Sequence, residues 1–293
     1  MRGRALGGPT PPHRRGSKSR PRVSGQLIHE VGHLVTRRDK AICRDILEHR
    51  FLTTKQAFRL HFSNLGRARA RLHRLYELRV LERFRPRRDT GSHPFHYVLD
   101  DIGVWIAAAY LGVDTKELRY DKRRALALVY SPQLTHMRDV NDFFSLLAQR
   151  GGHARSDARL ACWLGERACR QRWGGLVIPD GYGEIEGVRG GVGFFLELDG
   201  GTEPGARLSD KIDRYAPLAD MAECPDAVLF CFPSPEREAA ARRTLYDCGL
   251  TVATAVLNEH LRDPLGANWL ALSDNRRRPL TELATPTRER WSA

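Results

Sequence analysis

The predicted fold of the N-terminal third rests on residues 63–99, which read SNLGRARARLHRLYELRVLERFRPRRDTGSHPFHYVL. Ser63 or Asn64 is a good helix N-cap, and apolar residues then follow at helical spacing to about residue 78. Next come an alternating strand over residues 80–85, turn residues at 89–92 and a returning strand over 95–99. The segment therefore predicts one helix followed by a two-stranded hairpin.

Two shorter helices are predicted before this segment. Residues 39–48 place Ile42, Cys43, Ile46 and Leu47 on one face, and Thr53 or Thr54 caps a helix that runs through Leu60. Three helices and a hairpin, closed by an apolar helix over residues 102–111, are the order of a winged helix-turn-helix. In that fold the third helix enters the major groove, and the wing contacts a phosphate backbone or the minor groove.

Arginines gather on the parts of this domain that would face DNA. Those expected in the groove lie on the third helix, and those expected as wing contacts lie on the hairpin. The groove candidates are Arg67, Arg71 and Arg74, and the wing candidates are Arg83, Arg85, Arg87 and Arg88.

The positive charge of the chain is concentrated in the same region. Residues 1–88 hold 23 Lys and Arg against 6 Asp and Glu, whereas the remainder holds 25 against 29. Such segregation is typical of a module that binds a polyanion, with affinity from counterion release. Double-stranded DNA is therefore the expected partner, and a solubilising region or one that binds acidic membranes is the alternative.

The 293 residues have room for two domains. We expect a disordered basic arm (1–34), the winged helix-turn-helix (35–112), a helical linker that connects or dimerises (113–152), a second domain (153–273) and a tail (274–293). No apolar run is long enough to cross a membrane, and no signal peptide is present, so a cytoplasmic protein associated with plasmid or nucleoid is expected. The six cysteines form no C-x-x-C pair and indicate reduced thiols rather than a zinc site.

The second domain has the pattern of a mixed α/β fold. Helices are predicted over residues 158–173, 207–215 and 236–246, and strands over 176–178, 193–198, 227–232 and 252–257. Asp180 is expected to end one strand, and Glu197 and Asp199 leave the next on the same side. Such carboxylates favour a hard cation, Mg²⁺ or Mn²⁺, which would activate water at a phosphate. The alternative is that Asp180 only stabilises a turn.

This strand pair resembles the PD-(D/E)XK nuclease superfamily. The resemblance implies that Asp180 and Glu197 hold the metal and that Glu166 is an additional acidic residue. The superfamily usually has Lys two residues after the Glu, but this chain has Asp199 there. Lys211 on the following helix is the candidate for a relocated lysine, so the catalytic set is Asp180, Glu197, Asp199 and Lys211. Two uses of the domain stay open: DNA cleavage, or a nuclease-like fold that serves binding.

Taken together, both halves resemble the replication-relaxation family of actinobacterial plasmids and integrated mobile elements, over about residues 37–260. The residues that carry this resemblance are 51–54, 71–78, 95–100 and 195–203, together with Lys211 and Tyr215. It implies a DNA-associated role in plasmid replication, relaxation or mobilisation, with replication or transfer proteins as partners, and it fixes no reaction. A homodimer is plausible, because winged proteins often bind two half-sites.

One further motif points to a different class of protein. His29, Glu30 and His33 match H-E-x-x-H, which on a helix binds zinc in metallopeptidases. The residues before it are Arg, Pro and Gly and cannot supply the supporting strand. A zinc peptidase is therefore the remote alternative, and a short helix leading into the first domain is the simpler interpretation.

Overall fold

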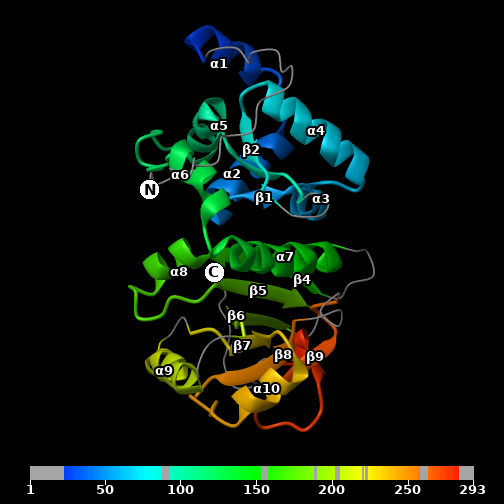
Figure 1. The fold of residues 1–293 in the computed structure, drawn as a ribbon, viewed down its shortest axis with the longest axis vertical. Helices are drawn as coiled ribbons and strands as arrows, with labels where there is room; N and C mark the ends of the chain where they lie inside the picture. The colour runs from blue at the N-terminus through cyan, green and yellow to red at the C-terminus, as the bar shows by residue number, and fades with distance from the viewer. Residues whose placement is uncertain are drawn as a thin grey trace, which may run out of the picture.

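The structure is a computed structural model. It describes residues 23–87, 93–152, 158–187, 190–201, 205–219, 221, 224–257 and 263–283. An N-terminal domain of helices with a small sheet lies above a C-terminal domain built on a larger sheet (Figure 1). The chain thus has a mixed α and β architecture. Among the described residues, no helix is both long and apolar enough to cross a membrane.

The N-terminal domain contains three helices followed by a hairpin, in the order expected from the sequence. The hairpin strands are antiparallel, with Leu81 opposite Leu99, and a short strand pairs on the other edge to give the order β1-β3-β2. Its elements are α1 (Gly25–Gly32), α2 (Arg37–His49), β1 (Leu52–Thr53), α3 (Thr54–His61), α4 (Leu65–Glu77), β2 (Leu81–Phe84), β3 (His96–Leu99), α5 (Asp101–Leu111) and α6 (Lys122–Ala127).

Side-chain caps fix where the three central helices begin. Thr36 and Asp39 form a capping box at the start of α2, and Thr53 and Gln56 form another at α3. The Asn64 side chain accepts from the Arg67 N–H and begins α4. These polar residues satisfy N–H groups that have no partner inside the helix, so the sequence fixes the entry into each helix locally.

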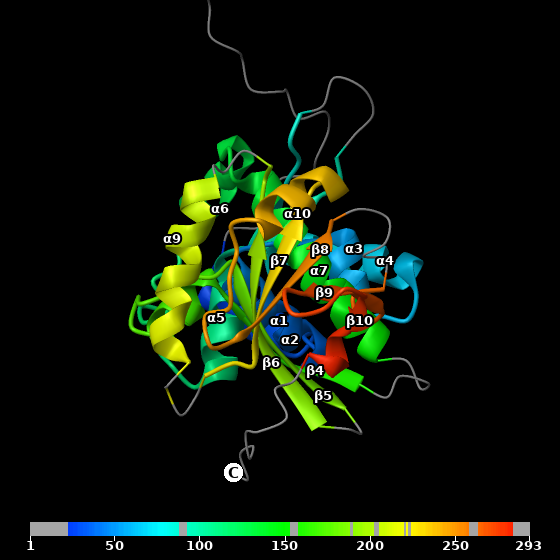
Figure 2. The same cartoon turned by 90° about the horizontal axis from the view of Figure 1, so that it is seen from below.

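The C-terminal domain is built on a seven-stranded mixed sheet in the order β10-β9-β8-β7-β6-β5-β4. Strands β4, β5 and β6 form an antiparallel meander, and β6, β7 and β8 run parallel. Figure 2 shows the twist of this sheet, with α9 along one side. The elements are α7 (Leu134–Gly151), β4 (Ala158–Gly165), α8 (Glu166–Arg172), β5 (Gly181–Gly187), β6 (Gly190–Leu198), α9 (Gly205–Tyr215), β7 (Ala227–Phe232), α10 (Pro235–Arg242), β8 (Thr251–Val256), β9 (Ala267–Ala271) and β10 (Arg278–Pro279).

The two faces of strand β6 belong to different cores. Phe194 and Leu196 pack with the Phe143 and Phe144 rings of α7, while Phe195 packs with Ile212 and Tyr215 of α9. Because side chains alternate along a strand, Glu197 lies on the same face as Phe195. The last turn of α9 is therefore positioned to reach the Glu197 carboxylate.

Several predicted boundaries are wrong. Residues 158–165 form strand β4 rather than the first half of a helix, because they pair along β5, and only 166–172 are helical. Residues 176–178 lie outside any strand, so Asp180 precedes β5 instead of ending a strand. The helix predicted over 236–246 ends at Arg242.

The predicted arm and tail are also partly wrong. Residues 25–32 of the arm form α1, whose Val31 is buried, and residues 1–22 lie outside the described part of the chain. In the tail, Leu280 and Leu283 are buried in the core of the C-terminal domain. That domain therefore extends at least to residue 283, where the described residues end.

Helix α7, predicted as part of a linker, is packed on two sides. One face places Phe143, Phe144 and Leu147 in the core of the sheet. The opposite side contacts the N-terminal domain: Gln56 donates to the Arg138 carbonyl at 3.1 Å, and Arg59 contacts the Asp142 carboxylate at 2.9 Å. The helix therefore joins the two domains through side-chain contacts as well as through the chain.

Candidate functional site

Helix α4 presents a basic face to solvent. Ala68, Leu72 and Leu75 are buried, while Arg67, Arg69, Ala70, His73 and Arg74 are exposed. Arg74 lies 3.3 Å from Glu77, an exposed pair that contributes little stability. Figure 1 shows α4 on the outer side of the N-terminal domain. Arg67 and Arg74 are thus exposed, as their spacing predicts, and Arg69, which was not predicted as a contact, is exposed on another side of the helix.

Arg71 does not share that exposed face, contrary to the expectation from its spacing. Its Nε lies 2.9 Å from Asp39 Oδ1 and its Nη2 2.5 Å from Asp39 Oδ2, and the Nη2 also donates to the Leu34 carbonyl at 2.9 Å. Burial raises the pKa of Asp39, but hydrogen bonds from Arg71 and Thr36 outweigh it and hold that pKa below its ordinary value. Arg71 therefore ties α4 to α2 and serves the fold.

The arginines of the hairpin, predicted as wing contacts, stack on aromatic rings. The Arg83 guanidinium lies 4.2 Å from the Tyr76 ring centre and 4.0 Å from that of Phe95, and Arg85 lies 3.8 Å from Phe95. Such cation–π contacts hold the arginines in place while leaving their charge intact. Arg87 is exposed, and Arg88 lies outside the described residues.

A cluster of ionisable groups surrounds Glu197 in the C-terminal domain. Lys211 Nζ lies 2.7 Å from Glu197 Oε2, and the Tyr215 hydroxyl donates to Oε1 at 2.5 Å. Lys211 and Tyr215 come from successive turns of α9, so both reach the same strand residue. Lys211, the candidate for a relocated lysine, therefore contacts Glu197 directly.

Asp180 belongs to the same cluster, held by a residue that the sequence did not reveal. His136 of α7 lies 2.8 Å from Asp180 Oδ1, and the Leu198 N–H donates to Oδ2 at 2.8 Å. No spacing pattern relates a histidine to an aspartate so far along the chain, so only the fold exposes this pair. We call Asp180, Glu197, Lys211, Tyr215 and His136 the acidic cluster.

The electrostatics of the acidic cluster follow from burial and proximity. Burial raises the pKa of Glu197 to about 7; Lys211 opposes this shift, and the negative charge of Asp180 adds to it. The hydrogen bond to Asp180 raises the pKa of His136. Each carboxylate thus has a basic partner, and the two carboxylates repel one another.

Two predicted acidic residues are engaged elsewhere. Asp199 Oδ2 lies 2.5 Å from Nη2 of Arg237 at the start of α10, and its Oδ1 accepts from the Gly201 N–H. Glu166 begins α8 and pairs with Arg170 at 3.4 Å. Asp199 therefore contacts α10 and a turn, Glu166 contacts its own helix α8, and both are left out of the acidic cluster.

The donor set of the acidic cluster fits a hard divalent cation that brings its own water. Within the described ranges, no group of three or more His, Cys, Asp and Glu side chains is placed to hold a metal ion. Mg²⁺, however, is commonly bound through one or two carboxylates and keeps several waters. Both oxygens of Asp180 and Oε1 of Glu197 have one hydrogen-bond partner each, and Oε2 of Glu197 forms only the ion pair with Lys211, so lone pairs are left for a cation. A cation would also relieve the repulsion between the two carboxylates.

The H-E-x-x-H motif lies on α1, and its histidines contact each other. The two Nε2 atoms of His29 and His33 are 3.3 Å apart, and Glu30 accepts a hydrogen bond from Gln26 at 2.9 Å. All three motif residues are exposed, and the part of the chain that the structure describes supplies no third metal ligand beside them. The structure therefore gives no support to the zinc peptidase.

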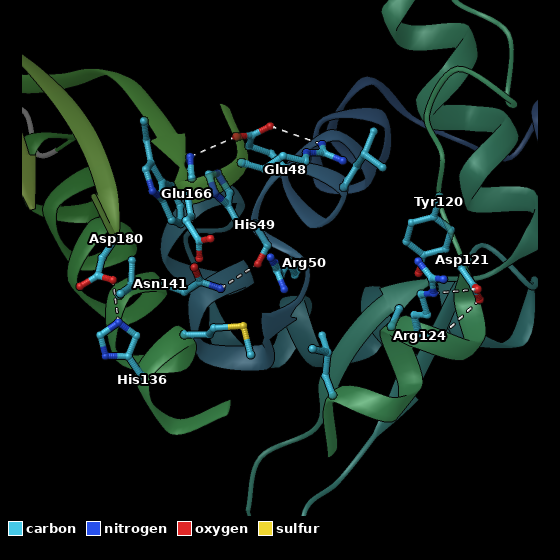
Figure 3. A pocket seen from close by; sticks show the side chains of 18 of the residues that line it. Glu48, His49, Arg50, Tyr120, Asp121, Arg124, His136, Asn141, Glu166 and Asp180 are labelled. Carbon is cyan, nitrogen blue, oxygen red and sulfur yellow. Dashed lines mark hydrogen bonds and ion pairs between the residues drawn. The ribbon is translucent and has the colours of Figure 1, made fainter. Parts of the chain in front are cut away.

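A pocket of about 400 Å³ lies between the two domains (Figure 3). His49, Arg50 and Tyr120 line it from the N-terminal domain, and His136, Trp163 and Asp180 line it from the C-terminal domain. The acidic cluster therefore reaches this pocket through Asp180 and His136.

His49 makes the domain interface sensitive to acid. Burial lowers its pKa to about 3, so the unfolded chain, with a histidine pKa near 6.5, binds more protons at pH 5. We expect the His49 contribution to unfolding free energy to fall by about 2 kcal/mol between pH 7 and pH 5. Urea unfolding at both pH values would show a smaller change in His49→Phe, which keeps the ring stacked on Trp163. An equal change in both proteins would contradict the assignment.

The comparisons with known proteins identify a family and no individual relative. Searches of curated proteins and of solved structures give no match. The model of the family described as replication-relaxation matches residues 44–230, well over half of the chain, from α2 to strand β7. The chain belongs to the replication-relaxation family.

Proposed function

We propose that this protein binds double-stranded DNA through the basic face of α4, as part of the replication or relaxation of a plasmid or mobile element. The family name supports the biological setting. The observation that carries DNA binding is the pair of exposed arginines Arg67 and Arg74, two turns apart on one side of a helix whose apolar face is buried. In a winged helix-turn-helix, this helix enters the major groove.

The hairpin beside α4 supports the same proposal. Arg83 and Arg85 are stacked on Tyr76 and Phe95 at the edge of the helix. Their positive charge extends the basic surface from α4 onto β2 and the residues after it. A duplex in contact with α4 would have these guanidinium groups beside its phosphate backbone, as in other winged proteins.

Replacing Arg67 and Arg74 together by Ala is expected to weaken duplex binding by about tenfold or more, and to reduce the salt slope of log K by about two. Each substitution removes one cation that would displace counterions from DNA. Fluorescence anisotropy with a labelled duplex over a range of salt concentrations measures both quantities. The control is Arg170→Ala with Arg243→Ala, an equal loss of exposed charge on the C-terminal domain. An equal loss of affinity in the control would show that the affinity depends on the net charge of the protein and not on the surface of α4.

A second candidate function is DNA cleavage at the acidic cluster in a PD-(D/E)XK-like domain. The observation that favours it is the convergence of Asp180, Glu197 and Lys211 from a loop, a strand and a helix. Asp180 and Glu197 would hold Mg²⁺ or Mn²⁺, which supplies a Lewis acid and lowers the pKa of bound water. Lys211 holds a positive charge beside Glu197, Tyr215 orients that carboxylate, and His136 orients Asp180.

Cleavage predicts that the protein converts supercoiled plasmid to open circles with Mg²⁺ or Mn²⁺, and that Asp180→Asn abolishes the conversion. The substitution keeps the size of the side chain but removes the negative charge that the cation requires. Gel electrophoresis of the plasmid measures it. Glu166→Gln, an acid outside the acidic cluster, should retain wild-type cleavage. Nicking that persists in Asp180→Asn would assign it to a contaminant.

A further inference from the structure

The pocket between the domains contains two guanidinium groups that have no acidic partner among the residues that the structure describes. Each of its other charged residues has a partner: Arg124 lies 3.6 Å from Asp121, Arg167 lies 3.9 Å from Glu48, Glu166 lies 3.4 Å from Arg170, and Asp180 is held by His136. Arg50 and Arg119 also line the pocket, and no ion pair joins either of them to any described residue. The whole lining holds four arginines and four carboxylates, and on the side of the N-terminal domain three arginines stand against two carboxylates, Glu48 and Asp121.

Arg50 is held in an unfavourable backbone conformation. Its φ is 69° and its ψ −38°, and the Phe51 N–H donates to the His49 carbonyl at 2.9 Å. This hydrogen bond around a residue with positive φ resembles the γ-turn that is rare and strained in proteins. A residue with a side chain persists there only where the surroundings enforce it.

Helix α7 enforces this turn across the domain interface. The buried Asn141 side chain donates to the Phe51 carbonyl at 2.9 Å and to the His49 carbonyl at 3.3 Å, which bracket Arg50 on both sides. Figure 3 shows Arg50 next to His49 and across from Asn141, with His136 and Asp180 at one end of the pocket. The fixed turn thus presents the Arg50 side chain to the pocket.

Arg119 shares the same unusual feature. Its φ is 47°, so it too lies in the left-handed region, in the segment between α5 and α6. Within the described ranges, three residues other than glycine have positive φ, and two of them line this pocket. Strained residues gather at ligand sites because a fixed, less stable geometry is kept where it positions a group.

We propose that Arg50 and Arg119 bind the phosphate of an unpaired nucleotide in the interdomain pocket. Arginine recognises phosphate through paired N–H donors, and a volume of about 400 Å³ suits a ligand of nucleotide size, not a double helix. This goes beyond duplex binding by α4, because it adds a second site for a separated strand. Cleavage of the bound strand at Asp180 would rest on the second candidate function, whereas the binding of the phosphate by Arg50 and Arg119 does not.

The phosphate has two possible sources, a single strand of DNA or a free nucleotide. The test uses full-length protein carrying Arg67→Ala and Arg74→Ala, so that α4 does not dominate binding. Fluorescence anisotropy with a labelled oligothymidylate measures the strand. Thymidine 5′-monophosphate and inorganic phosphate are added as competitors, and Arg50→Gly with Arg119→Gly removes the proposed site. Glycine adopts positive φ without strain, so these variants keep the backbone.

The double glycine variant is expected to bind the oligothymidylate about tenfold more weakly, while Arg123→Ala, an exposed neighbour that does not line the pocket, binds normally. Competition by the mononucleotide identifies a free nucleotide as a sufficient ligand, and its failure identifies the strand; both support the site. The proposal is overturned if the double variant binds the oligothymidylate as tightly as its parent. Duplex affinity, measured separately with α4 intact, tests the proposed function and not this pocket.

Discussion

Replacing Arg71 by Ala is expected to lower the free energy of unfolding by about 3 kcal/mol. The substitution leaves the fully buried Asp39 carboxylate without its cationic partner, and an uncompensated buried charge is among the most destabilising changes in a protein. It also removes the hydrogen bond to the Leu34 carbonyl, so that α4 loses its link to the segment before α2. Chemical denaturation followed by circular dichroism measures the change.

The matched control for this prediction is Arg69→Ala, two residues earlier on the same helix. Arg69 is exposed, so its removal should change stability by less than about 0.5 kcal/mol. Equal stability of the two variants would show that Asp39 does not depend on Arg71. Arg71→Ala is expected to lose DNA binding only where it is unfolded. Binding of this variant is therefore measured below its melting temperature.

Replacing Trp163 by Ala is expected to destabilise the protein by about 3 kcal/mol and to uncouple unfolding of the two domains. The indole is stacked between His49 of α2, with ring centres 3.4 Å apart, and Phe144 of α7, at 4.9 Å. Its removal leaves a cavity where the two domains meet. Denaturation followed by several probes would then show two transitions instead of one.

Trp163→Phe separates the contribution of aromatic stacking from that of side-chain volume. Phenylalanine keeps an aromatic ring between His49 and Phe144, and it removes a buried indole N–H that has no acceptor among the described residues. Loss of an unsatisfied donor offsets part of the lost volume, so a cost below about 1.5 kcal/mol is expected. Similar costs for the Phe and Ala variants would show that the stacking contributes nothing.

The elements of the N-terminal domain were predictable because their signals are local. Thr53 and Asn64 cap helices through hydrogen bonds to residues three positions later, and the buried face of α4 follows from the spacing of Leu72 and Leu75. What spacing did not determine is which polar residue faces solvent. Arg71 lies only three residues from Arg74, but the buried Asp39 draws its side chain inward.

The C-terminal domain was harder to predict because its signals are non-local. The apolar residues Leu160, Trp163 and Leu164 fit a helical spacing, yet pairing with β5 makes them a strand. The direction of the Glu197 side chain was predictable from strand alternation, whereas Lys211 was a candidate only through the resemblance to the PD-(D/E)XK superfamily. His136 was not, since its contact with Asp180 depends on how α7 packs across the sheet.

The packing of α7 between the two domains has a consequence for how this protein would work on DNA. Because α7 packs against both domains, the distance between the proposed duplex site on α4 and the proposed strand site in the pocket would be set by the fold. The number of nucleotides between the duplex bound on α4 and the separated strand bound in the pocket would then be the same on every DNA that the protein binds.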